Sequence, residues 1–142
     1  MTILNKKKHF ELFRKECEYW VNKFNLNDWR VAYRFDDDYD TWDVDARAVI
    51  KVDPEMSTRI AVIWLNMEWN SEELNEFNLR EAAFHEVLEL RLWSFRKMAE
   101  MPFPIGRIMI DKEVHIIIRI LEGLLFIDDL KKRKIKIAKE IK

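Results

Sequence analysis

Cysteine, glycine and proline are scarce in this sequence. It has one cysteine, two glycines and three prolines in 142 residues. Because Cys17 stands alone, the chain has neither a disulfide framework nor a cysteine-ligated zinc site. With so few glycines and prolines, long regular elements and few irregular loops are expected.

A large charge of one sign and a long apolar run are also missing. The chain has 25 Lys and Arg against 26 Asp and Glu, a net charge of -1, which gives no general attraction to nucleic acid. No apolar run approaches the roughly 18 residues that a membrane span needs. The N-terminal sequence MTILNKKKHF has no apolar signal segment. We therefore expect a soluble, cytoplasmic protein without membrane contact.

The composition that is present is typical of a globular protein. Apolar residues make up 49% of the chain, aromatic residues 13% and charged residues 36%. This length suits one buried core, so we expect a single domain over residues 1–130. Residues 131–142 contain seven Lys or Arg and are predicted to form a basic, solvated, frayed tail. Nucleic-acid contact through this tail is the weaker alternative.

Hydrophobic periodicity predicts the first half of the fold. Apolar residues at helical spacing predict an amphipathic helix over Lys6–Phe24, which Asn25 is suited to end. Strands are predicted over Trp29–Phe35, Ala46–Val52 and Ile60–Leu65. The third is apolar almost throughout, as expected for a strand that is central or covered on both faces. The short connections favour an antiparallel meander.

Six aspartates lie in the connection Asp36–Asp45. Three of them have the opening spacing of an EF-hand calcium loop. However, Thr41 stands where that loop needs glycine, and Arg47 where it needs its bidentate glutamate. A solvated hairpin connection is the preferred interpretation.

Two further helices are predicted in the second half. Asn78 and Glu81 have the spacing of a capping box, so the central helix should begin there and run to about Glu100. A proline-containing turn follows, and the strongly apolar segment Arg107–Asp129 predicts a final helix. The fold class expected is α+β, with an N-terminal helix, a three-stranded antiparallel sheet and two packed helices.

The central helix carries a His-Glu-x-x-Glu motif. His85 and Glu89 are four residues apart, which places both side chains on one helix face, one turn apart. Two ligands in this geometry can hold one metal ion. A catalytic zinc ion usually takes three protein ligands and a water, so a third ligand must come from elsewhere.

His115 is the best candidate for that third ligand. It lies on the apolar final helix, which must pack on the core, and a tight turn lets this helix return alongside the central one. The set of two imidazoles and one carboxylate is the inventory of a hydrolytic zinc site. Glu113 and Glu122 are rival third ligands, although Glu113 projects about 160° away from His115 around the helix.

The neighbouring charged residues suggest supporting roles. Glu86 is placed to act as a general base toward a zinc-bound water. Glu81 is placed to orient His85, and Arg119 or Glu122 to orient or neutralise the surroundings of His115. The alternative without metal is a buried polar network in which the two histidines are hydrogen-bonded to Glu122 and Glu81.

Several segments together resemble a known family. The helix end at residues 20–29 (WVNKFNLNDW), a three-strand region, the segment at 82–90 (AAFHEVLEL) and the segment at 113–122 (EVHIIIRILE) are similar to the small metallopeptidases encoded by bacteriophages and prophages. These are compact zincins of the minigluzincin and SprT-like types. The resemblance covers roughly His9–Ile127 and implies a zincin-like domain, with His85 as a ligand and Glu86 as the base. The wider family has His-Glu-x-x-His, so Glu89 and His115 as ligands depend on an exchange of His and Glu.

The function expected is that of a zinc-dependent metallohydrolase, most simply a phage-type metallopeptidase acting on a peptide or protein in the host cytoplasm. Another divalent transition metal could replace zinc. The alternative is an inactive zincin scaffold that binds a partner through the basic tail or exposed tryptophans. Trp42 and Trp69, which fall in connections, are candidates to line a substrate groove. The sequence leaves the oligomeric state open.

Overall fold

The structure of this chain is a computed structural model that describes residues 3–35, 46–55, 58–66, 74–93, 95–96 and 104–137. The chain divides into two compact units, Met1–Val87 and Leu88–Lys142. The division falls inside helix α2 (Glu76–Arg91), so residues of this one helix belong to both units. None of the helices in the described ranges is long and apolar enough to cross a bilayer.

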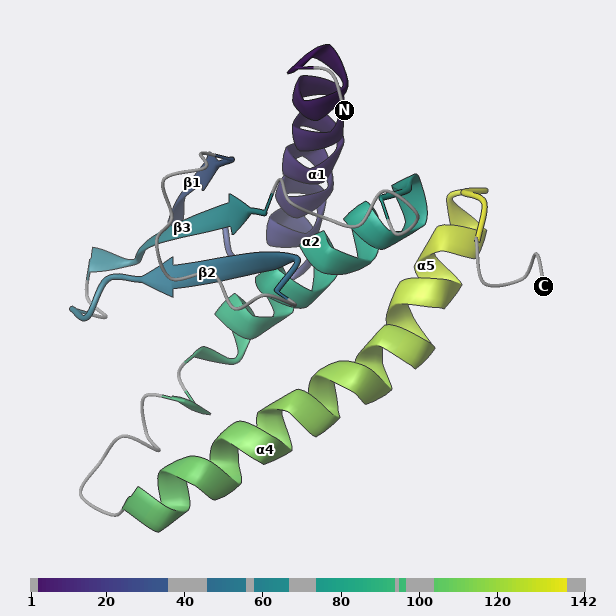
Figure 1. Cartoon of the computed structure of the whole chain (residues 1–142). Coiled ribbons are helices and arrows are strands. Elements are labelled where there is room, and N and C mark those ends of the chain that lie inside the picture. Colours follow the sequence, from purple (N-terminus) through teal and green to yellow (C-terminus); the bar gives the residue numbers. More distant parts are fainter. Residues whose placement is uncertain are drawn as a thin grey trace. The chain divides into compact units, whose positions relative to one another are not determined.

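The first helix is confirmed, as α1 (Ile3–Lys23; Figure 1). It ends where predicted, because Asn25 adopts the left-handed conformation with φ 57°. The Leu26 amide donates to the Val21 carbonyl at 2.8 Å, and the Asn25 amide donates to the Asn22 carbonyl at 3.1 Å. These two hydrogen bonds form a Schellman motif that satisfies the last carbonyls of the helix.

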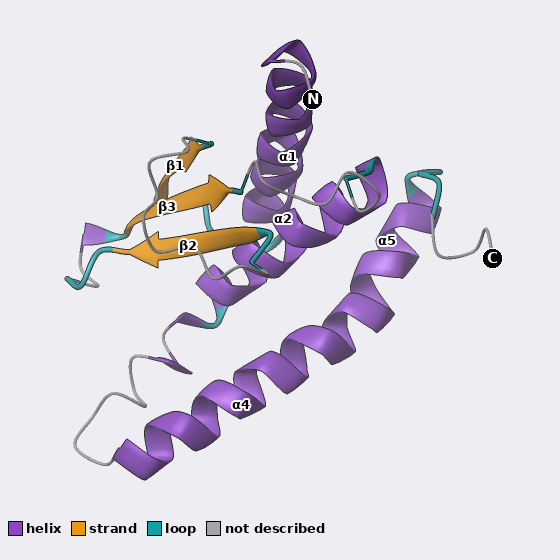
Figure 2. Ribbon diagram, in the orientation of Figure 1, coloured by secondary structure: helices purple, strands orange, loops and turns teal. Residues whose placement is uncertain are grey.

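The sheet of the first unit has three described strands, and their order corrects the predicted antiparallel meander. β1 (Arg30–Arg34), β2 (Ala48–Val52) and β3 (Ile60–Leu65) lie in the order β1-β3-β2 (Figure 2). β2 pairs antiparallel with β3, but β1 pairs parallel with it, so the sheet is mixed.

The connections account for this arrangement. Only residues 53–59 join β2 to β3, and so short a connection favours an antiparallel neighbour. The connection from β1 to β2 is longer, which leaves room for a third strand between them. β3 fills that place, as its apolar sequence predicted, and one of its faces is buried through Ala61, Ile63 and Leu65.

Helix α2 begins and ends earlier than predicted. Asn75, rather than Asn78, is the cap, because its Oδ1 accepts a hydrogen bond from the Asn78 amide at 2.8 Å. The α-helix starts at Glu76 and ends at Arg91, nine residues before the predicted end at Glu100, a residue that lies outside the described ranges.

Aromatic packing joins α1 to α2 within the first unit. The rings of Trp20 and Phe84 are 4.7 Å apart in an edge-on arrangement, and Phe24 lies 5.8 Å from Phe84. Phe84 is completely buried. This contact fixes the side of α2 that faces α1, which is the side next to His85 around the helix.

The second unit contains an almost continuous helical rod. α4 (Pro104–Leu121) passes into a π-helical segment, η2 (Glu122–Phe126), and then into α5 (Ile127–Lys132) (Figure 1). The predicted helix over Arg107–Asp129 is confirmed as helical structure, which extends beyond the predicted bounds at both ends. Pro104 starts it, because proline's missing N–H costs nothing in a first helical turn.

The prediction of a frayed basic tail is wrong for residues 131–137. Lys131 and Lys132 belong to α5, and Lys134 adopts the left-handed conformation with φ 59°. The Ile135 amide donates to the Leu130 carbonyl at 2.9 Å, which closes a second Schellman motif. Ile137 is buried, so the chain still contributes to a core here. Residues 138–142 lie outside the described ranges.

Candidate metal centre

Helix α2 presents His85 and Glu89 as the sequence predicts. Both lie within the regular part of the helix, one turn apart. His85 is half-buried, and Glu89 is buried, with 8% of its surface exposed. A carboxylate this far from water requires cationic or hydrogen-bonding partners, because burial alone disfavours its charged form.

His115 supplies one neighbour of that carboxylate. It lies on α4, and its Nε2 is 3.7 Å from Oε1 of Glu89. Val114 and Ile118 flank it and are buried, so this side of α4 is packed while the His115 side chain remains 37% exposed. The pairing of Glu89 with His115 was predicted from the turn between the two helices.

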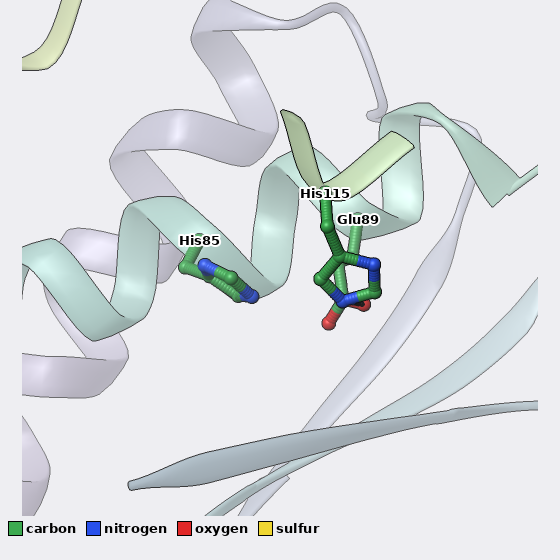
Figure 3. Close-up of side chains that lie close together, drawn as sticks. All are labelled: His85, Glu89 and His115. Carbon is green, nitrogen blue, oxygen red and sulfur yellow. Dashed lines mark ion pairs between the residues drawn. The ribbon is translucent and has the colours of Figure 1, made fainter. Parts of the chain in front are cut away.

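The three predicted ligands converge. One ligand atom each from His85, Glu89 and His115 lies within 4.8 Å of the other two. Figure 3 shows the His115 ring beside the Glu89 carboxylate, with the His85 ring on the same side of α2 one turn away. Two donors bound to one zinc ion at about 2.1 Å in tetrahedral geometry are roughly 3.4 Å apart. Small side-chain rotations would therefore bring these donors to ligand distance.

Arg96 is a member of the site that the sequence did not reveal. Its Nη1 donates a hydrogen bond to Oε1 of Glu89 at 3.2 Å. Its guanidinium group also lies 5.0 Å from the Trp93 ring, a cation–π distance. Arg96 follows Glu89 by seven residues, or two helical turns, and a helix running to about Glu100 places the two side chains on one face. This spacing is the signal that could have identified Arg96 from the sequence.

The proposed base, Glu86, is also buried, with 5% exposed. Its charge influences Cys17 on α1. Burial raises the pKa of the Cys17 thiol well above its usual value, and the negative charges of Glu86 and Glu16 raise it further. Glu86 therefore lies close enough to α1 to interact electrostatically with it. Its catalytic role stays a prediction.

The supporting residues occupy different surroundings. Oε1 of Glu81 lies 3.7 Å from Nη1 of Arg47, and this ion pair was not predicted from the sequence. Arg119 is exposed on α4, and Glu122 is half-buried as the first residue of η2. Of the rival third ligands, Glu113 is exposed on α4. Within the described ranges, the cluster with metal-ligand spacing contains neither Glu113 nor Glu122.

Two sequence predictions fall on residues that the structure does not describe. These are the aspartate-rich connection Asp36–Asp45 and the two tryptophans suggested for a substrate groove, Trp42 and Trp69.

Comparison with known proteins adds no relative. Neither a family model, nor a curated protein, nor a solved structure matches this chain. The candidate function therefore depends on the residues themselves.

Proposed function

We propose that this protein is a small zinc-dependent metallohydrolase in which His85, Glu89 and His115 hold the metal. The observation that supports the proposal is the convergence of these three donors within 4.8 Å. Two imidazoles and one carboxylate are the ligand set of known hydrolytic zinc sites. The resemblance of the two helical motifs to compact zincins points to the same reaction class, with a peptide or protein as the substrate.

The chemistry proposed follows from the ligand set. A divalent ion held there would lower the pKa of a bound water to about 7 and polarise a carbonyl oxygen. Glu86 follows His85 directly in α2, and we assign it the role of general base. It would accept a proton from the attacking water and return it to the nitrogen of the leaving amine. The carbon–nitrogen bond would then break with release of a neutral amine, while the hydroxyl group stays on the carbonyl carbon.

Metal content tests the binding half of the proposal. After purification without chelators, we expect close to one equivalent of zinc or another divalent transition metal. His115→Ala should lower the affinity for zinc at least tenfold, because it removes one of three ligands. Glu113→Gln is the matched control, since it changes an exposed residue of the same helix. A protein purified with less than a tenth of an equivalent, and unable to bind added zinc, would contradict the proposal.

Hydrolysis of a peptide library tests the catalytic half. Glu86→Gln should reduce kcat by a factor of roughly 10² to 10⁴ while the zinc content stays unchanged. Retained activity in this variant would show that Glu86 is not the base. Loss of zinc together with activity would show instead that Glu86 maintains the site.

A second candidate function has one specific observation in its favour. Glu89 already accepts a hydrogen bond from Arg96 and lies near His115, so these residues can form a polar network without a metal. In that case the protein would be an inactive scaffold that binds a partner. The zinc measurement separates the two candidates, because the scaffold requires no metal for its stability.

A further inference from the structure

A stripe of large apolar side chains is exposed on the second unit. The exposed fractions along it range from 41% to 67%, and its members are Ile116, Ile117, Ile120, Leu124 and Leu125. All five lie on α4 and η2. Contiguous exposed aliphatic residues of this size are uncommon on a monomer and mark a surface that is covered by a partner.

The stripe lies on a different face of the rod from the buried apolar residues. Ile116, Ile120 and Leu124 recur every fourth residue, and Ile117 and Leu125 lie beside that line. The buried side of the same rod carries Val114, Ile118 and Phe126. The rod is therefore apolar on two faces, and the exposed one has the pattern of a helix–helix contact surface.

We propose that this stripe binds the same stripe of a second copy, so that the rods of two chains pair antiparallel about a two-fold axis at Ile120. In this register, positions whose numbers add to 240 face each other. Ile116 then faces Leu124 of the second copy, and Ile120 faces its own equivalent. An isologous contact of this kind is the commonest route to a protein dimer.

The charges at the two ends of the stripe favour this orientation. Lys112 precedes the stripe and Asp128 follows it, and both are exposed. Antiparallel pairing about Ile120 brings Lys112 of each copy opposite Asp128 of the other, which is attractive. Parallel pairing would place like charges together, which is unfavourable. Asp128 also pairs with Lys132 of its own chain at 2.9 Å, so the contact would join an existing charge cluster.

Gly123 supplies space within the same surface. Apart from its two chain neighbours and the nearby backbone of its own helix, no heavy atom of the described residues lies within 4 Å of the position that a Cβ would occupy there. In the proposed register Gly123 faces Ile117 of the second copy, so a small residue meets a branched one. Such pairing of small with large side chains lets two helices approach closely.

The dimer is independent of the proposed metal site. His115 is one position, about 100° around the helix, from Ile116 and lies toward the packed side of α4. Covering the stripe therefore leaves the ligands in place, and each proposal can fail without the other.

Sedimentation velocity and light scattering on the full chain test the dimer. We expect a reversible dimer at concentrations up to about 100 μM. Ile120→Asp places two carboxylates at the two-fold axis and should weaken association at least tenfold. A chain that stays monomeric at this concentration overturns the proposal. So does a monomer that instead binds phosphatidylcholine vesicles through Ile120, because the stripe would then contact lipid.

Gly123→Leu separates specific packing from general stickiness. The Cβ of the added side chain has open space around it within its own chain, but the side chain fills the space that Ile117 of the second copy needs. Association should therefore weaken, although the stripe becomes more apolar. Stronger association would show nonspecific clustering and overturn the proposed packing.

Charge reversal tests the register. Lys112→Glu and Asp128→Lys should each weaken the dimer, and the double variant should recover most of the affinity. If the double variant is weaker than either single variant, the antiparallel register is wrong.

Cross-linking gives a direct distance. At the two-fold axis, helices about 8–10 Å apart bring equivalent Cα atoms to about 5 Å, which a disulfide can span. Ile120→Cys should therefore form a covalent dimer on mild oxidation, while native Cys17 is completely buried. Lys112→Cys is the control, since its equivalents would be about 24 Å apart along the axis. Equal cross-linking of both variants would refute the register.

Discussion

Arg96 donates a hydrogen bond from Nη1 to Oε1 of Glu89 at 3.2 Å. The same carboxylate oxygen is the one nearest His115, at 3.7 Å. A metal ion that takes Glu89 as a ligand must therefore compete with a guanidinium group for one oxygen, or share the carboxylate with it. Arg96 thus offsets the negative charge of Glu89 and reduces its availability to a cation.

Removing this competitor should strengthen metal binding. We expect Arg96→Ala to raise the affinity for zinc by roughly three- to tenfold, because a partly exposed charged hydrogen bond is worth about 1 kcal/mol. Competition titration with a zinc chelator measures this change. Arg91→Ala, which removes the same charge from an exposed position at the end of α2, is the control and should have little effect. Weaker binding in Arg96→Ala would mean that Arg96 orients Glu89 for the metal.

Much of the helical structure could be predicted because its signals are local. The buried positions of α1 recur at helical spacing, and Asn25 tolerates the left-handed turn that ends it. The spacing of His85 and Glu89 needs only a regular helix to become a pair. The central position of β3 also followed from its apolar composition.

The remainder depends on relations that a linear pattern does not contain. Alternating side chains look alike in parallel and antiparallel strands, so β1 gave no sign of its parallel pairing with β3. The π-helical segment starting at Glu122 follows from packing, because its wider turn brings Phe126 back onto the buried face.

A buried ion pair in the first unit should be sensitive to losing one partner. Glu16 is 1% exposed, pairs with Arg80 and accepts a hydrogen bond from Trp20 Nε1 at 3.0 Å. We expect Arg80→Met to lower the free energy of unfolding by about 3 kcal/mol, because it leaves a carboxylate buried without its cation. The double variant Glu16→Leu with Arg80→Met should recover most of that loss.

Urea unfolding followed by tryptophan fluorescence measures these changes. Arg14→Met is the matched control, since Arg14 pairs with Glu11 and Glu18 at partly exposed positions and should cost less than about 1 kcal/mol. If Arg80→Met lowers the free energy of unfolding as little as Arg14→Met does, the buried ion pair does not stabilise the fold as expected.

The cap of α2 makes a smaller but distinct contribution. Asn75→Ala should lower the free energy of unfolding by about 1 kcal/mol, because the Asn78 amide loses its side-chain acceptor. Asn75→Ser keeps an oxygen at the capping position and should recover most of that amount. Urea unfolding measures the stability of both variants. If Asn75→Ala and Asn75→Ser are equally stable, the side-chain oxygen at position 75 does not stabilise the start of α2.

The buried Cys17 thiol should make the protein less stable in alkaline solution. Burial, with the nearby charges of Glu86 and Glu16, raises the pKa of this thiol well above its ordinary value of about 8.5. Above that pH the unfolded chain loses the thiol proton while the folded chain keeps it. The unfolded state then binds fewer protons, so the free energy of unfolding falls as the pH rises.

The contribution of Cys17 is expected to be a loss on the order of 1 kcal/mol between pH 7.5 and pH 9.5. The pKa of Tyr33 is also raised by burial. Tyr33 therefore lowers the free energy of unfolding only as the pH approaches about 10, the ordinary pKa of tyrosine. Comparing urea unfolding of the native chain with Cys17→Ala isolates the thiol, because the cavity left by the substitution costs the same at both pH values. The free energy of unfolding of the variant should therefore fall less than that of the native chain across this interval, by an amount on the order of 1 kcal/mol. Identical losses in the two proteins would show that the folded thiol ionises as readily as the unfolded one, which its complete burial beside two carboxylates argues against.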